Sequence, residues 1–178
     1  GPRGTPTLNG ARVYTLGATG VLNALKASDG PVVWSRNAVA DAGTKVPQWG
    51  CASSPLVVDD VVIVYAGKRV AYEIATGRPR WSGPNGGVSY SSPQLMTFGG
   101  VAQVVISDGK GATSITPLNG KLLWQHPWAS SIVQPGVTAE GDLLITAVGD
   151  AGGIGMRRIA VTGGPGGWTV EERWTSSG

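Results

Sequence analysis

One short pattern occurs three times in this chain and limits its fold more than any other feature. The pattern is an apolar residue, three residues, Asp, Thr or Asn, then Gly, three residues and Trp. It runs from Leu25 to Trp34, from Tyr72 to Trp81 and from Ile115 to Trp124. These tryptophans are 47 and 43 residues apart, and Trp174 follows the third after 50 residues. A period of this length is typical of a β-propeller blade.

A second signal precedes each of these tryptophans and divides the repeat into strands. It is a small or polar residue followed by proline: Thr5-Pro6, Ser54-Pro55, Ser92-Pro93 and, in the fourth place, Gln134-Pro135. Each pair opens a short apolar run, a turn such as Asn9-Gly10 follows, and then comes a β-branched run such as Val61–Tyr65. Alternating apolar runs and tight-turn residues of this kind predict hairpins. We therefore expect each unit to hold four antiparallel strands, with the tryptophan on the fourth.

The expected fold class is all-β: β-propeller blades, present as four four-stranded antiparallel repeats in a single propeller segment over residues 1–178. The approximate blades are 1–46, 47–86, 87–130 and 131–178, each within the roughly 40 to 50 residues of known blades. The fourth unit is irregular. It has a Gly-rich stretch, Gly149–Gly155, an insertion at Gly163–Trp168, and Trp174 without the preceding Gly-x3. We see no helical periodicity longer than one turn.

The repeated tryptophans are explained by blade packing. One blade cannot cover its own apolar faces, and a Trp on the outer strand fills the gap toward the rim between two blades. Glycine at the turn before it can take a positive φ and leaves room for a ring against bare backbone. We therefore interpret these tryptophans as structural, each packing on the Gly turn of the next blade.

Composition excludes several classes of protein. A hydrophobic content of 41% with only 14% charged residues is that of a folded chain rather than a disordered one. The net charge of +3 comes from scattered basic residues, so no nucleic-acid partner is expected. No apolar run approaches the ~18 residues of a membrane helix, so no membrane insertion is expected. Cys51 is the single cysteine, which excludes an intrachain disulfide, and no signal sequence is visible.

The repeat resembles the tryptophan-docking repeat of the pyrroloquinoline-quinone (PQQ)-like β-propellers. The segments ending at Trp34, Trp81 and Trp124 resemble the family consensus A-x-D-x-x-T-G-x-x-x-W, and Trp174 is the weak match. The family includes quinoprotein dehydrogenases and non-catalytic propellers, among them the lipoprotein of the bacterial outer-membrane β-barrel assembly machinery. The resemblance implies a periplasmic or cell-envelope setting and favours the non-catalytic branch.

The cofactor site of the family's enzymes is not recognisable here. In those enzymes a ring formed by two adjacent cysteines stacks on the quinone, and Cys51 has no cysteine neighbour. Calcium needs several converging oxygen ligands, and the candidates are spread over three of the four units with no recognisable ligand spacing: Asp29, Asp41, Asp108 and Asp150. We therefore expect no cofactor, no metal and no catalytic residue. PQQ and calcium belong only to the alternative interpretation, a fragment of a PQQ-dependent quinoprotein alcohol dehydrogenase.

Four residues are candidates for partner-binding loops. Trp49, Trp128 and Trp168 lie outside the repeated Trp position, beside Gly or Pro, where exposed aromatic rings anchor a protein or glycan. The alternative is that they fill blade junctions. Arg157 lies in the strand-like run Met156–Val161 and could contact an acidic partner.

Two other signals are better explained by structure than by chemistry. His126 is the only histidine and has no neighbour at ligand spacing, so a structural or solvated histidine is expected. The stretch Gly149–Gly155 is similar to a phosphate-binding loop, but such a loop needs a following helix, and a strand-like run follows here.

The expected function is a non-catalytic scaffold that presents loops to a protein or small ligand. Four blades also raise the question of closure, because an arc exposes two blade faces. Two arcs related by a two-fold axis would make one closed ring of eight blades. We therefore expect a homodimer closing an eight-bladed ring.

Overall fold

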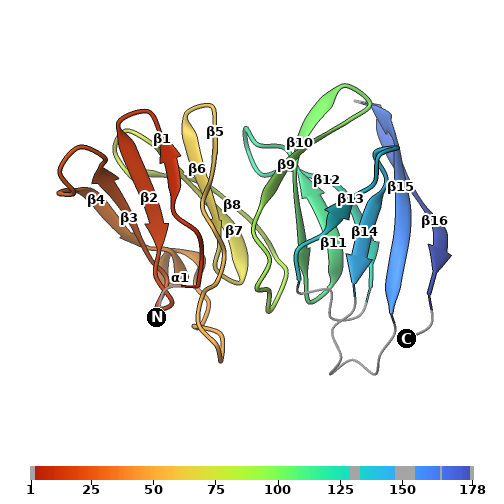
Figure 1. Cartoon of the computed structure of the whole chain (residues 1–178), viewed down its shortest axis with the longest axis horizontal. Helices are drawn as coiled ribbons and strands as arrows, with labels where there is room; N and C mark the ends of the chain where they lie inside the picture. Colours follow the sequence, from red (N-terminus) through yellow and green to blue (C-terminus); the bar gives the residue numbers. More distant parts are fainter. Residues whose placement is uncertain (1–2, 129–132, 147–154, 165, 177–178) are drawn as a thin grey trace. The chain divides into compact units, whose positions relative to one another are not determined.

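The computed structural model describes residues 3–128, 133–146, 155–164 and 166–176. The chain divides into two compact units, Gly1–Asn85 and Gly86–Gly178. The described residues form four antiparallel sheets of four strands each, two in either unit, with one short helix in the first (Figure 1). In each sheet the strand order follows the chain order. The fold class is all-β, and each sheet is one propeller blade.

The first unit holds two blades. Blade 1 consists of β1 (Thr7–Asn9), β2 (Arg12–Leu16), β3 (Val21–Lys26) and β4 (Val32–Asn37). Helix α1 (Ala38–Ala42) follows. Blade 2 consists of β5 (Leu56–Val58), β6 (Val61–Tyr65), β7 (Lys68–Glu73) and β8 (Pro79–Asn85).

The second unit holds the other two blades. Blade 3 consists of β9 (Gln94–Phe98), β10 (Val101–Asp108), β11 (Gly111–Ile115) and β12 (Leu122–Pro127). Blade 4 consists of β13 (Gly136–Val137), β14 (Leu143–Thr146), β15 (Met156–Gly164) and β16 (Gly167–Thr175). The run predicted at Val61–Tyr65 is β6 itself, since a β-branched run between turn residues favours a strand.

Every blade has the same irregularity between its third and fourth strands, and the repeated tryptophan lies at it. Trp34 is opposite Ala24, and the next residue, Leu25, is opposite Val32, two positions before the tryptophan. The same shift occurs at Trp81, Trp124 and Trp174. An extra residue in one strand bends and twists the sheet locally. Trp174 therefore occupies the repeated Trp position, although its sequence lacks the Gly-x3 pattern.

Helix α1 was not predicted from periodicity, because five residues are too few to show one. Its ends are nevertheless marked in the sequence. The side chain of Asn37 accepts a hydrogen bond of 3.0 Å from the backbone N–H of Ala40, and Gly43 ends the helix with φ of 62°. Ala38, Val39 and Ala42 are buried in the core between blades 1 and 2, so the helix, which is part of the connection between these blades, closes one side of that core.

Each unit has an apolar core between its two sheets. The first core comprises side chains from β2, β3, β4, α1, β6 and β7, including Tyr14, Leu22, Trp34, Val62 and Tyr72. The second comprises side chains from blades 3 and 4, including Phe98, Val105, Trp124, Leu143 and Ile159. Sheets of this kind bury apolar faces only by stacking on one another, so adjacent blades form the unit of stability.

The irregular fourth unit is explained in part by a long hairpin. Strands β15 and β16 pair along almost their whole length: Arg157 lies opposite Thr175 at one end, and Gly164 lies opposite Gly167 at the other. The described residues of the insertion predicted at Gly163–Trp168 therefore lie at the closed end of this hairpin. The Gly-rich stretch Gly149–Gly155 lies outside the described residues except for Gly155. No helix in the described part of the chain has the length and apolar character to cross a membrane.

Candidate interaction sites

The junction of blades 1 and 2 is organised around one backbone carbonyl, that of Ile74 in the turn after β7. The indole Nε1 of Trp34 donates to it at 3.0 Å, and the hydroxyl of Tyr14 donates at 3.4 Å. The guanidinium of Arg12 donates to the same carbonyl and to that of Ala75 at 3.0 Å. Three side chains of blade 1 therefore hold one turn of blade 2.

Gly77 lies under the ring of Trp34. Its φ is 71°, and a Cβ atom there would lie 2.7 Å from Cδ2 and from Cε3 of the indole. Trp34 also lies between two tyrosines, with ring-centroid distances of 5.9 Å to Tyr14 and 6.4 Å to Tyr72. Only glycine leaves room for the ring at this turn.

At the junction of blades 3 and 4, the hydrogen bond of the repeated tryptophan stays within its own blade. Trp124 is buried, and its Nε1 donates to Oε1 of Gln103 at 2.8 Å. The hydroxyl of Ser114 donates to the same oxygen at 2.6 Å. Blade 4 presents its long hairpin here instead of a Gly turn, and Val161, Trp168 and Val170 pack against this core.

Two of the candidate residues, Trp128 and Arg157, are brought together beside this junction. The guanidinium carbon of Arg157 lies 3.7 Å above the ring centroid of Trp128, which is 8% exposed. Such stacking is a cation–π contact. The same guanidinium lies 3.1 Å from a carboxylate oxygen of Glu172 and donates to Thr175 Oγ1 at 2.8 Å. An acidic partner would have to displace Glu172 in order to reach Arg157.

His126 completes this group, which we call the Arg157 cluster: His126, Trp128, Arg157, Glu172 and Thr175. Arg157 Nη1 lies 3.2 Å from His126 Nε2. Because a guanidinium only donates, Nε2 must accept, which requires a neutral imidazole. Burial and the charge of Arg157 lower the pKa of His126 and outweigh the opposite effect of Glu172. The sequence had given no reason to connect His126, Glu172 and Thr175 with Arg157.

This pKa shift predicts a pH dependence of stability. Above the unfolded pKa of about 6.5, His126 is neutral in both states. As the pH falls through that value, the unfolded chain binds the proton first, so stability present at neutral pH is lost. We expect the melting temperature to fall between about pH 7.5 and about pH 5, and to fall less in His126→Gln. An equal fall in both proteins, measured by circular dichroism, would contradict this role.

Trp168 lies near the tip of the long hairpin and is partly buried. It packs against the core of blades 3 and 4, and its Cζ/Cη edge approaches Gly99, where a Cβ atom would lie 3.7 Å from Cη2. Its placement matches the interpretation in which a tryptophan fills a blade junction.

Trp49, unlike Trp168, is half exposed to solvent. It lies in the loop of residues 44–53, here called the Trp49 loop, and is 52% exposed, while Val46 in the same loop is 46% exposed. The loop is held firmly: Thr44 Oγ1 donates to Ala66 O at 2.6 Å, and the N–H of Cys51 donates to Ala18 O at 2.8 Å. The loop therefore presents two apolar side chains to solvent on a fixed backbone.

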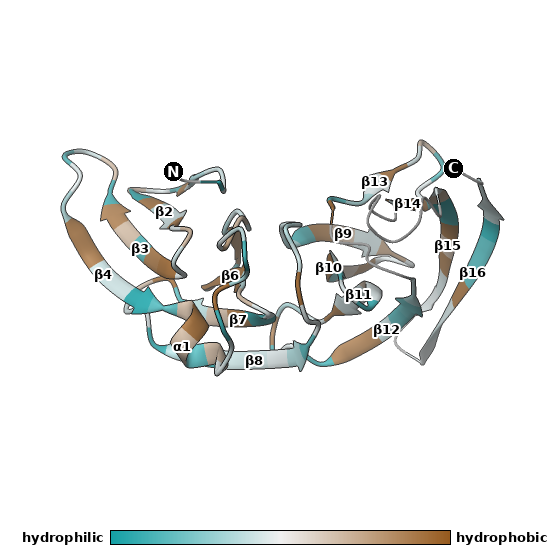
Figure 2. Cartoon of the chain, turned by 90° about the horizontal axis from the view of Figure 1, so that it is seen from below, coloured by the Kyte–Doolittle hydropathy of each residue, from teal (hydrophilic) through white to brown (hydrophobic). Residues whose placement is uncertain are grey.

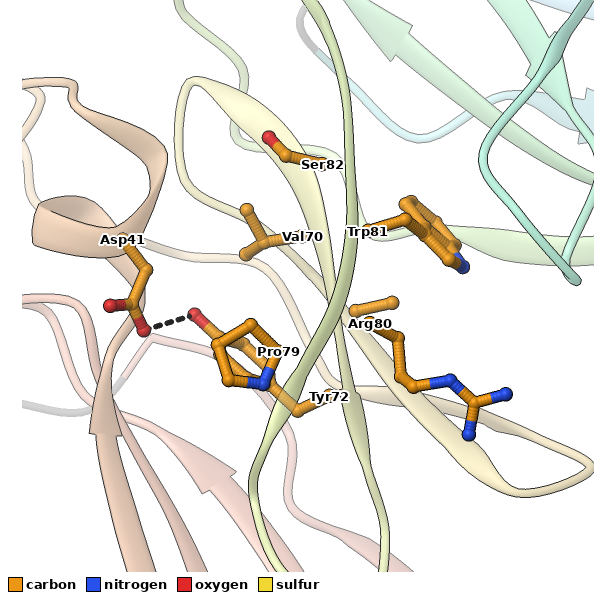
Figure 3. A pocket seen from close by; sticks show the side chains of 8 residues that line it. Asp41, Val70, Tyr72, Pro79, Arg80, Trp81 and Ser82 are labelled. Carbon is orange, nitrogen blue, oxygen red and sulfur yellow. Dashed lines mark hydrogen bonds between the residues drawn. The ribbon is translucent and has the colours of Figure 1, made fainter.

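One hollow lies against the outer strands of blade 2. Its volume is about 180 Å³, and it is lined by Asp41, Val70, Ala71, Tyr72, Pro79, Arg80, Trp81 and Ser82. In Figure 3, Asp41 comes from α1, and Tyr72 donates to its carboxylate at 2.9 Å. Burial and this hydrogen bond raise the pKa of Tyr72. Ligand pockets usually measure about 300–1,000 Å³, so this hollow is small for a cofactor.

Among the described residues, the carboxylates considered as calcium ligands do not converge on one site. No three His, Cys, Asp or Glu side chains in the part of the chain that the structure describes lie close enough together to hold a metal ion. Cys51 is buried, and burial raises the pKa of its thiol, which disfavours the reactive thiolate. Asp41 is held by Arg36 and Tyr72, while Asp150 lies outside the described residues.

The four sheets define the chain as a set of PQQ-like β-propeller blades. A family model described as outer membrane protein assembly factor BamB matches residues 1–170. The chain belongs to this family. No curated protein matches it at a significant level.

Solved structures share the fold at low sequence identity. BamB from Moraxella catarrhalis is similar with a TM-score of 0.66 and 20% identity, over 99% of this chain and 50% of that one. Quinohemoprotein alcohol dehydrogenase from Comamonas testosteroni gives a TM-score of 0.68 and 14% identity, over 99% of this chain and 35% of that one. The chain thus spans half or less of either structure. The computationally designed Ika4 protein gives 0.54 and 16%, over 98% of this chain and 93% of that one.

Proposed function

We propose that this chain is a non-catalytic scaffold of the bacterial cell envelope, in the periplasm, and that it binds a protein partner through the Trp49 loop. The membership in a family described as an outer membrane protein assembly factor supports the envelope setting. The observation that carries the binding role is the half-exposed Trp49 beside the exposed Val46 on a loop fixed by hydrogen bonds.

Two physical effects favour a half-exposed tryptophan as a binding residue. A partner buries its apolar ring, and little side-chain entropy is lost on binding. A rigid, half-exposed tryptophan loses little conformational freedom on binding, and tryptophans of this kind dominate interface energies. Trp128 and Trp168 are less suited, because their rings are already packed at the junction of blades 3 and 4. The proposal therefore ranks Trp49 above the other three candidates. A small ligand remains the alternative occupant of the same loop.

Replacing Trp49 by alanine tests the proposal. We expect the melting temperature to stay nearly unchanged, because half of the ring is exposed, and partner affinity to fall at least about tenfold. The measurement is capture from a bacterial envelope extract on immobilised wild type, Trp49→Ala and Leu118→Ala, with mass spectrometry of the retained proteins. Leu118 is the control, a 74% exposed apolar side chain that belongs to neither the Trp49 loop nor the proposed homodimer contact.

The expected result is a protein retained by wild type and Leu118→Ala but not by Trp49→Ala. If every retained protein is bound equally by all three, the Trp49 loop is not the binding site.

The alternative function is a fragment of a quinoprotein alcohol dehydrogenase, which the likeness to the Comamonas testosteroni enzyme keeps in view. The missing cysteine pair and the missing carboxylate cluster among the described residues speak for the scaffold. Titration with PQQ and calcium separates the two functions. We expect neither a change in quinone absorbance nor a higher melting temperature at large ligand excess, since a ligand that binds the folded state must stabilise it. Stabilisation would support the enzyme fragment.

We further propose that two copies of the chain associate into a homodimer. Blade 1 and blade 4 each carry exposed apolar side chains, including Leu8, Val32 and Trp174. In this proposed homodimer, two sets of four blades related by a two-fold axis make one closed ring of eight blades.

A further inference from the structure

The junction of blades 1 and 2 shows what one blade needs from the next. Blade 2 offers a row of side chains that lie side by side across its strands: Val57, Val62, Tyr72 and Pro79. Val62 and Tyr72 are fully buried against blade 1. Beside this row, the turn of Ile74 and Gly77 takes the indole of Trp34. A docking face therefore combines an apolar row with a Gly turn.

Blade 1 has the same face, and among the described residues its side chains are exposed or only partly buried. Its equivalent row consists of Leu8, Val13, Leu25 and Val32. Leu8 is 68% exposed and Val32 is 58% exposed. Within the unit that contains it, blade 2 packs on the opposite face, where Tyr14 and Trp34 lie. Figure 2 shows the hydrophobic colour on β3 and at the start of β4.

The turn beside this row, at Asp29 and Gly30, has the backbone conformation and the open space that an indole ring needs. Gly30 has φ of 88°, close to the 71° of Gly77. Gly77 is buried under an indole, whereas Gly30 is exposed, and a Cβ atom there would meet nothing within 4 Å. Ala27 in this turn is equivalent to Ile74 in blade 2. The N–H of Ala27 donates to the carbonyl of Ala11, just before β2, and the N–H of Ile74 donates to the carbonyl of Asp60, just before β6.

The complementary tryptophan lies on blade 4. Trp174 is opposite Arg158, which is opposite Leu144, and this row corresponds to the row of Tyr14, Ala24 and Trp34 in blade 1. The other face of blade 4, with Leu143 and Ile159, packs on blade 3. Trp174 is 43% exposed, while Trp34 is 9% exposed and Trp124 is 5% exposed.

We propose that Trp174 of one copy docks on blade 1 of a second copy. Its indole covers the turn of Asp29 and Gly30, its Nε1 donates to the carbonyl of Ala27, and the same face of blade 4 covers Leu8. The occupant is a second copy because this chain carries both halves of the contact, a half-exposed donor tryptophan and an open acceptor turn. In the proposed homodimer, the two-fold axis gives two such contacts, one for the tryptophan of each copy. This assignment rests on the proposed homodimer and names the residues that hold it.

The assignment is tested by sedimentation velocity over a range of concentrations with wild type, Trp174→Ala, Leu8→Glu and Trp49→Ala. The sedimentation of wild type and of Trp49→Ala should correspond to an apparent mass of twice the 18.2 kDa of the chain. In Trp174→Ala and Leu8→Glu, the dimer dissociation constant should rise about thirtyfold or more, the usual loss when a central interface tryptophan is truncated. Both residues are exposed, so circular dichroism should show folded protein in either variant.

A mixture of the two variants gives a sharper readout. Each variant alone has two damaged contacts per dimer. A dimer of one Trp174→Ala copy and one Leu8→Glu copy has one intact contact, between the tryptophan of the second and the leucine of the first. We therefore expect the mixture to associate more tightly than either variant alone. If wild type is a monomer at every concentration, the homodimer itself is wrong. If wild type is a dimer and neither variant weakens it, the homodimer stands and the Trp174 contact is wrong.

Discussion

Replacing Trp34 by alanine is expected to lower the free energy of unfolding by about 3–5 kcal/mol, the usual cost of truncating a buried Trp or Phe. The ring is 9% exposed and packs against two tyrosines, and its Nε1 donates a hydrogen bond of 3.0 Å to the carbonyl of Ile74. Alanine leaves a cavity between blades 1 and 2 and removes the donor from a carbonyl that two other side chains share. The measurement is urea unfolding followed by far-UV circular dichroism, at one protein concentration.

Two matched variants separate packing from the hydrogen bond and from the mere loss of a tryptophan. Trp34→Phe keeps most of the ring without the N–H, so it should cost less than Trp34→Ala. Trp49→Ala removes a half-exposed ring and should cost less than about 1 kcal/mol. Equal losses for Trp34→Ala and Trp49→Ala would show that the ring of Trp34 does not hold the blades together.

The second large effect is expected at the turn under Trp34. Gly77→Ala introduces a Cβ atom 2.7 Å from the indole at a residue with φ of 71°. The left-handed conformation costs about 1–2 kcal/mol for alanine, and overpacking of a fixed neighbour adds about 1–3 kcal/mol. We therefore expect a loss of about 2–5 kcal/mol in the same unfolding measurement.

Gly30→Ala is the matched control, because its φ is also positive but its surroundings are open. It should cost only the conformational part, about 1–2 kcal/mol. Both substitutions are made in the Trp174→Ala protein, so that self-association does not enter the comparison. If Gly77→Ala and Gly30→Ala lower the free energy of unfolding equally, the indole of Trp34 accommodates a methyl group at no cost. In that case the close packing is not the reason for glycine at position 77.

The sequence predicted the blades because the signals for them are local. Tight turns such as Asn9-Gly10 and β-branched runs such as Val61–Tyr65 favour hairpins through the backbone of a few neighbouring residues. Helix α1 was not predicted, because its five residues are too short for a period, and the caps Asn37 and Gly43 were its only signals.

The candidate residues show where local patterns stop being informative. Trp49, Trp128 and Trp168 look alike in sequence, each beside Gly or Pro, yet one is half exposed and two are packed at a blade junction. Burial depends on which strands from distant parts of the chain lie against a ring, and neighbouring residues do not encode it. The same is true of Arg157, which reaches His126 across 31 positions.

The sequence by itself determined the number of repeats, their strands and the Gly turn at which each tryptophan can be received, since a fixed spacing and a positive φ act within a few residues. The sequence offered Trp174 as the fourth member by its spacing alone, and the structure confirmed it, because the strand pair of Trp174 has the irregularity that the other three tryptophans share. Only the tertiary structure decided that the turn of Gly77 is covered and that of Gly30 is open, because covering a turn requires another blade.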